Sequence, residues 1–188
     1  MQKIHLSSRR GVLGSSVGLF IFFSVISSGI FASSPALAIQ RGEEVKVVFC
    51  NDGDTCGVLR TTGEQIKVRL GGIDAPERGQ DFYMESKRYL EGLIKNRFVK
   101  LECNGFSGTR AACIVFLDGR NINAEMVIAG YAWDYPTHSR RRYGQMQQDA
   151  ENDVRGLWSG ENIMSPFCFR FNQGFAAKEC AENPRYQL

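Results

Sequence analysis

Five charged side chains in this sequence have types that suit phosphate chemistry. Three are acids, Asp54, Asp74 and Glu77, which follow turns or the ends of expected strands. Two are arginines: Arg69 projects from the non-core face of one expected strand, and Arg110 begins another. Acids beside glycine turns can form an oxygen-rich site for a hard cation such as Ca²⁺, and arginine can hold a phosphate through two parallel hydrogen bonds. Together they predict a phosphoryl site with a metal, two guanidiniums and a carboxylate that orients water.

Each of these residues also has an ordinary structural interpretation. Asp-Gly pairs, such as Asp52-Gly53 and Asp118-Gly119, are common chain reversals. Acid–arginine pairs on strand faces are commonly solvent-screened ion pairs. Residue types and spacing alone therefore leave both interpretations open.

Charge and histidine content narrow the possible chemistry. The chain has 188 residues, with 23 Lys and Arg, 20 Asp and Glu, and 2 His. Residues 1–38 hold three basic residues and no acid, so the remainder is balanced and cannot coat nucleic acid by bulk attraction. His138 is the sole histidine after residue 38, which excludes zinc sites built from several histidines. A polyanion site must therefore be a local patch.

The hydrophobic pattern predicts the elements that would position these side chains. Runs of β-branched and aromatic residues predict five short strands, at 45–49, 55–60, 65–70, 98–103 and 110–117. Apolar stripes and capping residues predict three helices, at 81–96, 123–129 and 139–155. Loops are expected at 73–80 and 104–109.

This order of elements is typical of an α+β fold: a five-stranded OB-type β-barrel with three flanking helices. A closed barrel would leave no sheet edge unpaired. Sandwich topologies remain an alternative on the pattern alone. We expect one domain over residues 39–160, followed by an irregular tail at 161–188.

The N-terminal segment predicts export. Residues 1–38 have a basic start, an apolar stretch and an Ala36-Leu37-Ala38 end, which together indicate a cleaved signal peptide. An uncleaved membrane anchor is the alternative, but serines and a glycine interrupt the apolar stretch. An Arg9-Arg10 pair resembles a twin-arginine signal, so the export route stays open. We expect a secreted or periplasmic protein with no membrane attachment after cleavage.

The cysteine content agrees with export. All six cysteines follow residue 38, and an even number in an exported chain predicts disulfides. Six cysteines allow 15 connectivities. Neighbours along the sequence favour Cys50–Cys56, Cys103–Cys113 and Cys168–Cys180.

Several motifs decide between the interpretations by their resemblance to a known family. They are DGDT at 52–55, IKVRLGGIDAPE at 66–77, Arg110 with VFLDG at 115–119, Ile122-Asn123, AGYAW at 129–133 and GLW at 156–158. In this order they resemble the staphylococcal nuclease-like (thermonuclease) family over about residues 45–158. The VRL to GIDAPE segment is highly specific, whereas DGDT alone is weak. The family fold is an OB-type barrel with helices.

The resemblance implies a role for each matched position. Asp54 and Asp74 would bind Ca²⁺ through carboxylates, and Ala75 through its backbone carbonyl. Glu77 would position or deprotonate the attacking water. The two arginines, Arg69 and Arg110, would bind the scissile phosphate and stabilise the transition state. We expect the loss of the Arg69, Glu77 or Arg110 side chain to lower turnover without unfolding the barrel.

Two features concern substrate binding. The family usually has an aromatic residue and a glycine before the second arginine, where this chain has Gly108 and Thr109, so we expect weaker nucleotide binding. Tyr135 could stack on a base, and the basic run Arg140, Arg141 and Arg142 could follow a strand backbone. His138 is expected to be a surface residue.

Taken together, the resemblance, the leader and the cysteines predict an exported, Ca²⁺-dependent nuclease, which we expect to be a monomer. It would hydrolyse single-stranded or frayed DNA and RNA to 3′-phosphate products. Two other functions remain open: a non-catalytic OB module of the same family that binds a peptide or an oligosaccharide, and a calcium-binding structural protein. The first predicts a degraded site, and the second gives no reason for two arginines.

Overall fold

The computed structural model describes residues 39–161 and 163–171. The predicted signal peptide, residues 1–38, and Cys180 lie outside the described residues. Among the helices of the described part, none has the length and apolar character that crossing a membrane requires.

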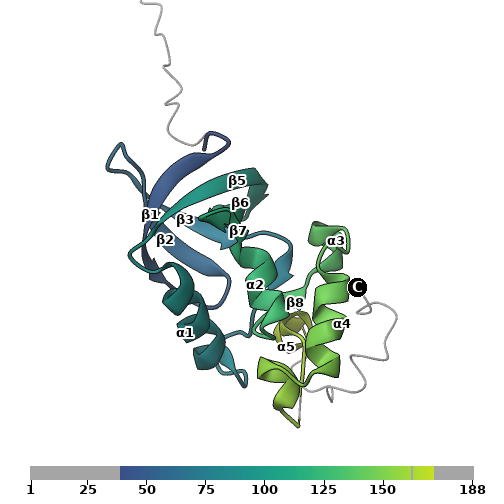
Figure 1. Cartoon of the computed structure of the whole chain (residues 1–188). Helices are drawn as coiled ribbons and strands as arrows, with labels where there is room; N and C mark the ends of the chain where they lie inside the picture. Colours follow the sequence, from purple (N-terminus) through teal and green to yellow (C-terminus); the bar gives the residue numbers. More distant parts are fainter. Residues whose placement is uncertain (1–38, 162, 172–188) are drawn as a thin grey trace, which may run out of the picture. The chain divides into compact units, whose positions relative to one another are not determined.

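Five strands form a closed barrel (Figure 1). They are β1 (Glu43–Cys50), β2 (Thr55–Leu59), β3 (Gln65–Leu70), β5 (Phe98–Ser107) and β6 (Arg110–Leu117). Neighbours in the order β3-β2-β1-β5-β6 are antiparallel, and a parallel pairing of β3 with β6 closes the ring. The predicted α+β fold with an OB-type barrel is confirmed. Closure satisfies the backbone groups that an open sheet edge would expose.

Three helices correspond to the predicted ones: α1 (Tyr83–Ile94), α2 (Ile122–Ile128) and α4 (Gly144–Asn152). The described residues add the short helices α3 (Pro136–Ser139) and α5 (Pro166–Phe171) and a 3-10 helix, η1 (Gly156–Ser159). The helix predicted at 139–155 begins later because Arg140 and Arg141 have positive φ angles of 57° and 60°, which an α-helix excludes. Helix α5 lies in the segment predicted as an irregular tail, so that expectation does not hold for its described part.

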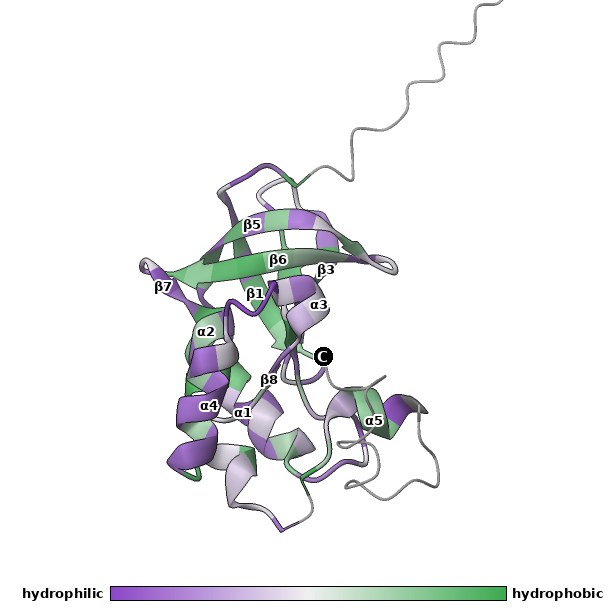
Figure 2. Ribbon diagram, turned by 90° about the vertical axis from the view of Figure 1, so that its right-hand side faces the viewer, coloured by the Kyte–Doolittle hydropathy of each residue, from purple (hydrophilic) through white to green (hydrophobic). Residues whose placement is uncertain are grey.

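Alternating burial along the strands builds the core. In β6 every second residue is buried, from Ala111 to Leu117, whereas the intervening residues are partly exposed. Buried side chains of α1 and α2, such as Leu90, Ile94 and Met126, extend this core beyond the barrel. Figure 2 shows the resulting contrast between the apolar residues of the barrel strands and the mainly hydrophilic α4.

Two local predictions were wrong. The loop expected at 73–80 begins with a strand, β4 (Ile73–Asp74), which pairs with β8 (Trp133–Asp134) outside the barrel. The turn expected at 104–109 is shorter, because β5 continues to Ser107 after a register shift. A strand pair of two residues has too short a hydrophobic pattern to be recognised in the sequence.

Two predicted disulfides are present in the barrel. Cys50–Cys56 joins β1 to β2, and Cys103–Cys113 joins β5 to β6. In each case the two cysteines are direct partners in the strand register. Cys168 is also disulfide-bonded, but its predicted partner lies outside the described residues.

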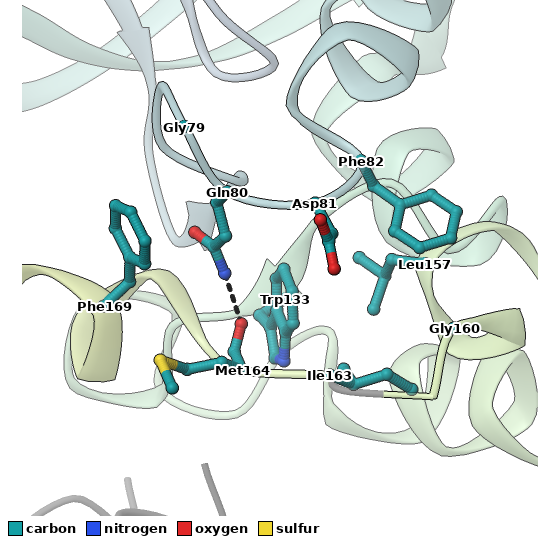
Figure 3. Close-up of a pocket in the computed structure, with 10 residues that line it drawn as sticks. All are labelled: Gly79, Gln80, Asp81, Phe82, Trp133, Leu157, Gly160, Ile163, Met164 and Phe169. Carbon is teal, nitrogen blue, oxygen red and sulfur yellow. Dashed lines mark hydrogen bonds between the residues drawn. The ribbon is translucent and has the colours of Figure 1, made fainter. Parts of the chain in front are cut away.

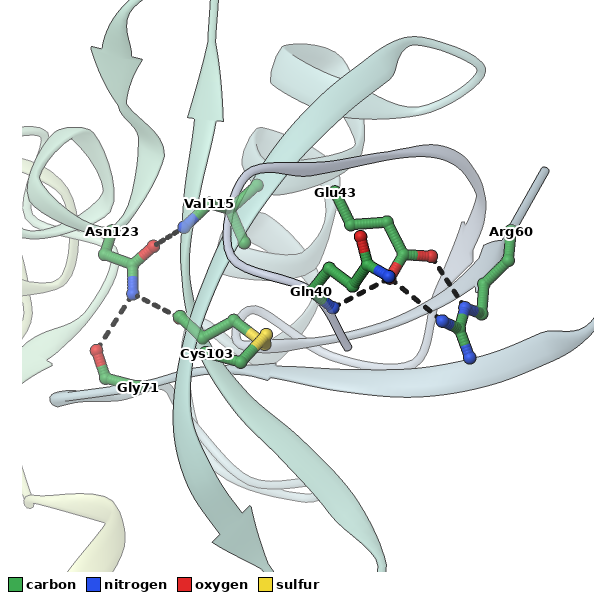
Figure 4. The surroundings of a disulfide bond; sticks show 8 residues. Gln40, Glu43, Arg60, Gly71, Cys103, Val115 and Asn123 are labelled. Atoms are coloured by element: carbon green, nitrogen blue, oxygen red, sulfur yellow. Dashed lines mark hydrogen bonds and ion pairs between the residues drawn. A yellow bond between two sulfur atoms is a disulfide. The ribbon is translucent and has the colours of Figure 1, made fainter. Parts of the chain in front are cut away.

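A buried asparagine ties α2 to the barrel (Figure 4). Asn123 is fully buried, and its Oδ1 accepts from the Val115 N–H at 3.0 Å. Its Nδ2 donates to the carbonyls of Gly71 at 2.9 Å and Cys113 at 3.1 Å. The N-cap of α2 is Asn121, whose side chain accepts from the Ala124 N–H.

We therefore expect Asn123→Ala to lower the free energy of unfolding by about 2–4 kcal/mol, because it leaves buried backbone groups without partners. The control is Asn152→Ala, at an exposed position with one long hydrogen bond to Gln148. Urea titration of both variants measures the difference. Equal losses would show that the buried network contributes no more than a surface contact.

A paired carboxylate joins the beginning of β1 to the residue after β2 (Figure 4). The Arg60 guanidinium donates to Glu43 at 2.6 Å and 3.0 Å, in a two-pronged contact with little solvent exposure. The hydrogen bond from Arg60 is the main reason that the pKa of Glu43 lies below its ordinary value of 4.5.

The lowered pKa gives a pH-dependent prediction. The ionised carboxylate stabilises the fold above the pKa of the unfolded chain, and this stabilisation is lost as the pH falls through the lower folded pKa. Glu43→Gln should therefore lower the free energy of unfolding by about 1–2 kcal/mol at pH 7, with a much smaller difference near pH 3. Guanidinium chloride titrations at the two pH values test this. An equal loss at both would contradict it.

Candidate active site

The strand register brings residues from three strands to one face of the barrel. Thr55 at the start of β2 pairs with Arg69 near the end of β3, and Arg69 pairs in parallel with Ala112 of β6. Arg110 begins β6, two residues before Ala112. Its Nη1 donates to Thr55 Oγ1 at 3.2 Å. Side chains that are far apart in the sequence therefore line one pocket of about 310 Å³.

One guanidinium joins two buried carboxylates in this region. Arg69 Nη1 lies 2.5 Å from Asp54 Oδ1, and Arg69 Nη2 lies 2.7 Å from Asp74 Oδ1. The side chains of Asp54 and Asp74 are only 4% and 3% exposed, and that of Arg69 is 13% exposed. The two carboxylates thus share the Arg69 guanidinium, which lies between them.

The turn before β2 fixes Asp54. Its Oδ1 also accepts from Thr55 Oγ1 at 2.8 Å, and its Oδ2 accepts from the Ala75 N–H at 3.0 Å. The turn lies so close to α1 that a Cβ on Gly53 would come within 1.8 Å of Ser86 Oγ. Glycine at this position therefore lets the turn approach both α1 and the loop at Ala75.

Burial is the largest influence on the pKa values of Asp54 and Arg69. It raises the pKa of Asp54 to about 7, the Arg69 guanidinium opposes this rise, and the neighbouring charges of Asp52 and Asp74 add to it. Burial opposes the charge of Arg69, but the two carboxylates still raise its pKa above the ordinary value. The site concentrates negative charge away from water, which a bound cation would compensate.

Glu77 lies on the loop after β4 and lines the same pocket. Its backbone N–H donates to Gln80 Oε1 at 3.0 Å, which holds the loop in a compact turn. Its carboxylate is partly exposed, with 37% of the side chain accessible. An acid that water can reach, in the pocket that Arg69 and Arg110 also line, suits a group that orients water.

The other predicted binding residues do not all lie at this pocket. Tyr135 lines the pocket of Asp54 and Arg69. The run Arg140, Arg141 and Arg142 is exposed between α3 and α4 and does not line that pocket.

Three further titratable residues, which the sequence did not assign to this pocket, also line it: Asp52, His138 and Arg170. The His138 ring stacks on Tyr135 with ring centroids 4.4 Å apart and planes 14° apart. Arg170 comes from α5 and contacts Asp74, from which 96 residues separate it. The DGD turn is a local signal that points to Asp52, but no local pattern marks Arg170.

The donor set suits a hard cation only in part. Asp54 and Asp74 provide carboxylate oxygens, and the loop places Ala75 beside Asp54. Within residues 39–161 and 163–171, no group of three or more His, Cys, Asp or Glu side chains is arranged to hold a metal. A cation here would need backbone oxygens or water to complete its coordination, as Ca²⁺ commonly has.

The geometry predicts different contributions of Arg69 and Arg110 to the stability of the fold. We expect Arg69→Ala to lower the free energy of unfolding by about 3–5 kcal/mol, because it leaves the buried Asp54 carboxylate without its ion-pair partner and Asp74 with Arg170 alone. Arg110→Ala is the matched control, since its two hydrogen bonds are long, at 3.2 Å and 3.4 Å. Thermal and urea unfolding of both variants measures this. Similar losses in the two variants would contradict this role of Arg69 in stability. The predicted destabilisation departs from the expectation, drawn from the sequence, that the loss of Arg69 leaves the fold intact.

Comparisons with known proteins match this chain to a family. The sequence model described as staphylococcal nuclease homologue matches residues 67–160. The chain is 39% identical to an uncharacterized endonuclease of Haemophilus influenzae, over 81% of this chain and 82% of that protein. It is 34% identical to a micrococcal nuclease of Shigella flexneri, over 75% of this chain and 86% of that protein. It is 33% identical to the protein ParB of Escherichia coli, over 75% of this chain and 85% of that protein. The chain therefore belongs to the staphylococcal nuclease family.

Proposed function

We propose that this staphylococcal nuclease-like nuclease is exported and requires Ca²⁺. It would hydrolyse single-stranded or frayed DNA and RNA and leave 3′-phosphate ends. The observation that carries the proposal is the convergence of Arg69, Asp54 and Asp74 in one cluster, with Arg110 on the same pocket. The barrel disulfides support export, because such bonds persist in oxidising compartments.

The two arginines would bind the scissile phosphate. Arg110 makes only long hydrogen bonds with the described residues, to Ser107 and Thr55, so its guanidinium can form stronger ones with phosphate oxygens. Arg69 would exchange its contacts with carboxylate oxygens for contacts with the phosphate. Two positive groups then neutralise the charge that develops in the transition state.

Asp54, Asp74 and the Ala75 carbonyl would hold Ca²⁺. When bound, this ion supplies positive charge that polarises the phosphate.

Glu77 would orient the attacking water and accept its proton. The water oxygen forms a bond to phosphorus, and the bond from phosphorus to the 5′-oxygen breaks. The 5′-oxygen takes up a proton from solvent and leaves as a hydroxyl, the phosphate stays on the 3′-oxygen, and Glu77 releases its proton to solvent. The position of Glu77 on the pocket, with a partly exposed carboxylate, supports this role.

The stacked pair Tyr135 and His138 offers a flat surface beside the phosphate site. Bases stack on aromatic side chains with little sequence preference, since every base has a π-face. This supports a single-stranded substrate, whose bases are free to stack. It does not require the exposed arginines 140–142.

The purified protein should cleave single-stranded DNA with Ca²⁺ and stop when a chelator is added. Arg110→Ala and Glu77→Gln should each lower kcat by about 10²–10⁴, because each removes a group that acts in the transition state. Unfolding of the Arg110→Ala variant serves as the control for its fold. The product ends are identified by their sensitivity to a 3′-phosphatase.

Near-full activity of Arg110→Ala would show that the site is assigned wrongly. Binding without cleavage under all conditions would instead indicate a non-catalytic OB module. Cleavage that persists in chelator would refute the Ca²⁺ requirement while leaving the nuclease assignment in place.

A further inference from the structure

An arginine from outside the family-matched segment contacts the acids of the active site. Arg170 Nη2 lies 2.8 Å from Asp74 Oδ2, and its Nη1 lies 3.1 Å from Asp74 Oδ1. The same Nη1 lies 2.7 Å from Glu77 Oε1. One guanidinium thus joins an acid proposed to hold the cation to the acid proposed to orient water.

These contacts leave Asp74 with both oxygens engaged. Oδ1 accepts from Arg69 and Arg170, and Oδ2 accepts from Arg170. A cation that binds Asp74 through Oδ2 must compete with the Arg170 guanidinium for that oxygen. The Arg170 side chain remains 30% exposed, so it can move away without disrupting the core.

Helix α5 is docked so that it presents this side chain. Gln80 joins the two segments, because its Oε1 accepts from the Glu77 N–H and its Nε2 donates to the Met164 carbonyl (Figure 3). Phe169, beside Arg170 in α5, lines a pocket of about 190 Å³ with Gly79 and Trp133. The loop that carries Glu77 and the helix that carries Arg170 therefore contact each other through neighbouring residues.

The charges of the pocket support competition. Four acids, Asp52, Asp54, Asp74 and Glu77, face three arginines when Arg170 is included. Without Arg170 four acids face two arginines, so the acids are in excess. The Arg170 guanidinium supplies part of the positive charge that a cation would otherwise provide.

We propose that Arg170 sets the cation affinity of the active site by occupying Asp74 and Glu77 when no cation is bound. This inference rests on the proposed Ca²⁺-dependent function. The cation and Arg170 exclude each other at Asp74 Oδ2, so binding of the ion displaces the guanidinium. The release of Arg170 also frees the Glu77 carboxylate for its proposed role with water.

The test measures Ca²⁺ binding directly, by isothermal titration calorimetry without nucleic acid. Arg170→Gln should bind Ca²⁺ about tenfold more tightly than the wild type, which is the gain expected when a charge-assisted competitor is removed. The Ca²⁺ concentration for half-maximal cleavage should fall by a similar factor. The matched control is Arg78→Gln, which removes one positive charge at an exposed position next to Glu77 and outside the pocket lining.

A second variant separates competition from a general loss of structure. Phe169→Ala keeps the guanidinium but weakens its presentation by α5, so it should also tighten Ca²⁺ binding, to a smaller extent. Circular dichroism and thermal unfolding report on the fold of each variant.

The outcomes distinguish this inference from the proposed function. Equal Ca²⁺ affinity in wild type and Arg170→Gln, with cleavage still dependent on Ca²⁺, would overturn the inference alone. An unchanged affinity with a raised KM would make Arg170 a substrate ligand instead and would also overturn it. An equal gain in Ca²⁺ affinity for Arg78→Gln would show that net charge alone causes the effect, and it would overturn the inference. Cleavage with no Ca²⁺ binding in either protein would refute the Ca²⁺ requirement itself, and the inference with it.

Discussion

The active site depends on one guanidinium held between two buried carboxylates. Without Arg69, Asp54 would be a buried carboxylate beside a second one, with no guanidinium of its own, which is unfavourable in a folded chain. With it, the barrel can keep acids in a position where an ordinary protein has apolar side chains. The interaction that makes the site chemically capable is therefore the same one that makes it compatible with folding.

Barrel closure explains why this arrangement is possible. The parallel pairing of β3 with β6 places Arg69 beside Ala112, and the antiparallel pairing of β2 with β3 places it beside Thr55. A shift of one residue in either register would turn Arg69 toward the core. The small residue Ala112 leaves room on the pocket side, while Arg110 reaches in from the beginning of its strand. The geometry of the site is thus a consequence of strand pairing.

The parts that the sequence predicted correctly are those with a local signal. The five barrel strands follow from alternation and turn residues, and two disulfides follow from neighbouring cysteines. Motifs such as DGDT and GIDAPE pointed to the acids around Arg69. Arg170 had no such signal, because its contact with Asp74 spans 96 residues and depends on how α5 docks. His138 was expected to be a surface residue, and it is exposed, but only the folded chain shows that it also stacks on Tyr135 at the pocket.

The disulfide Cys50–Cys56 encloses the turn that carries Asp54. The accessible residues of this turn are Asn51 and Asp52, where a protease could cut the chain. A single cut between these two residues would leave both new ends covalently attached to the barrel, since the bridged cysteines lie on either side of the break. The two halves of a nicked chain could not separate by diffusion. The bridge therefore keeps a chain that is cut in this turn covalently in one piece.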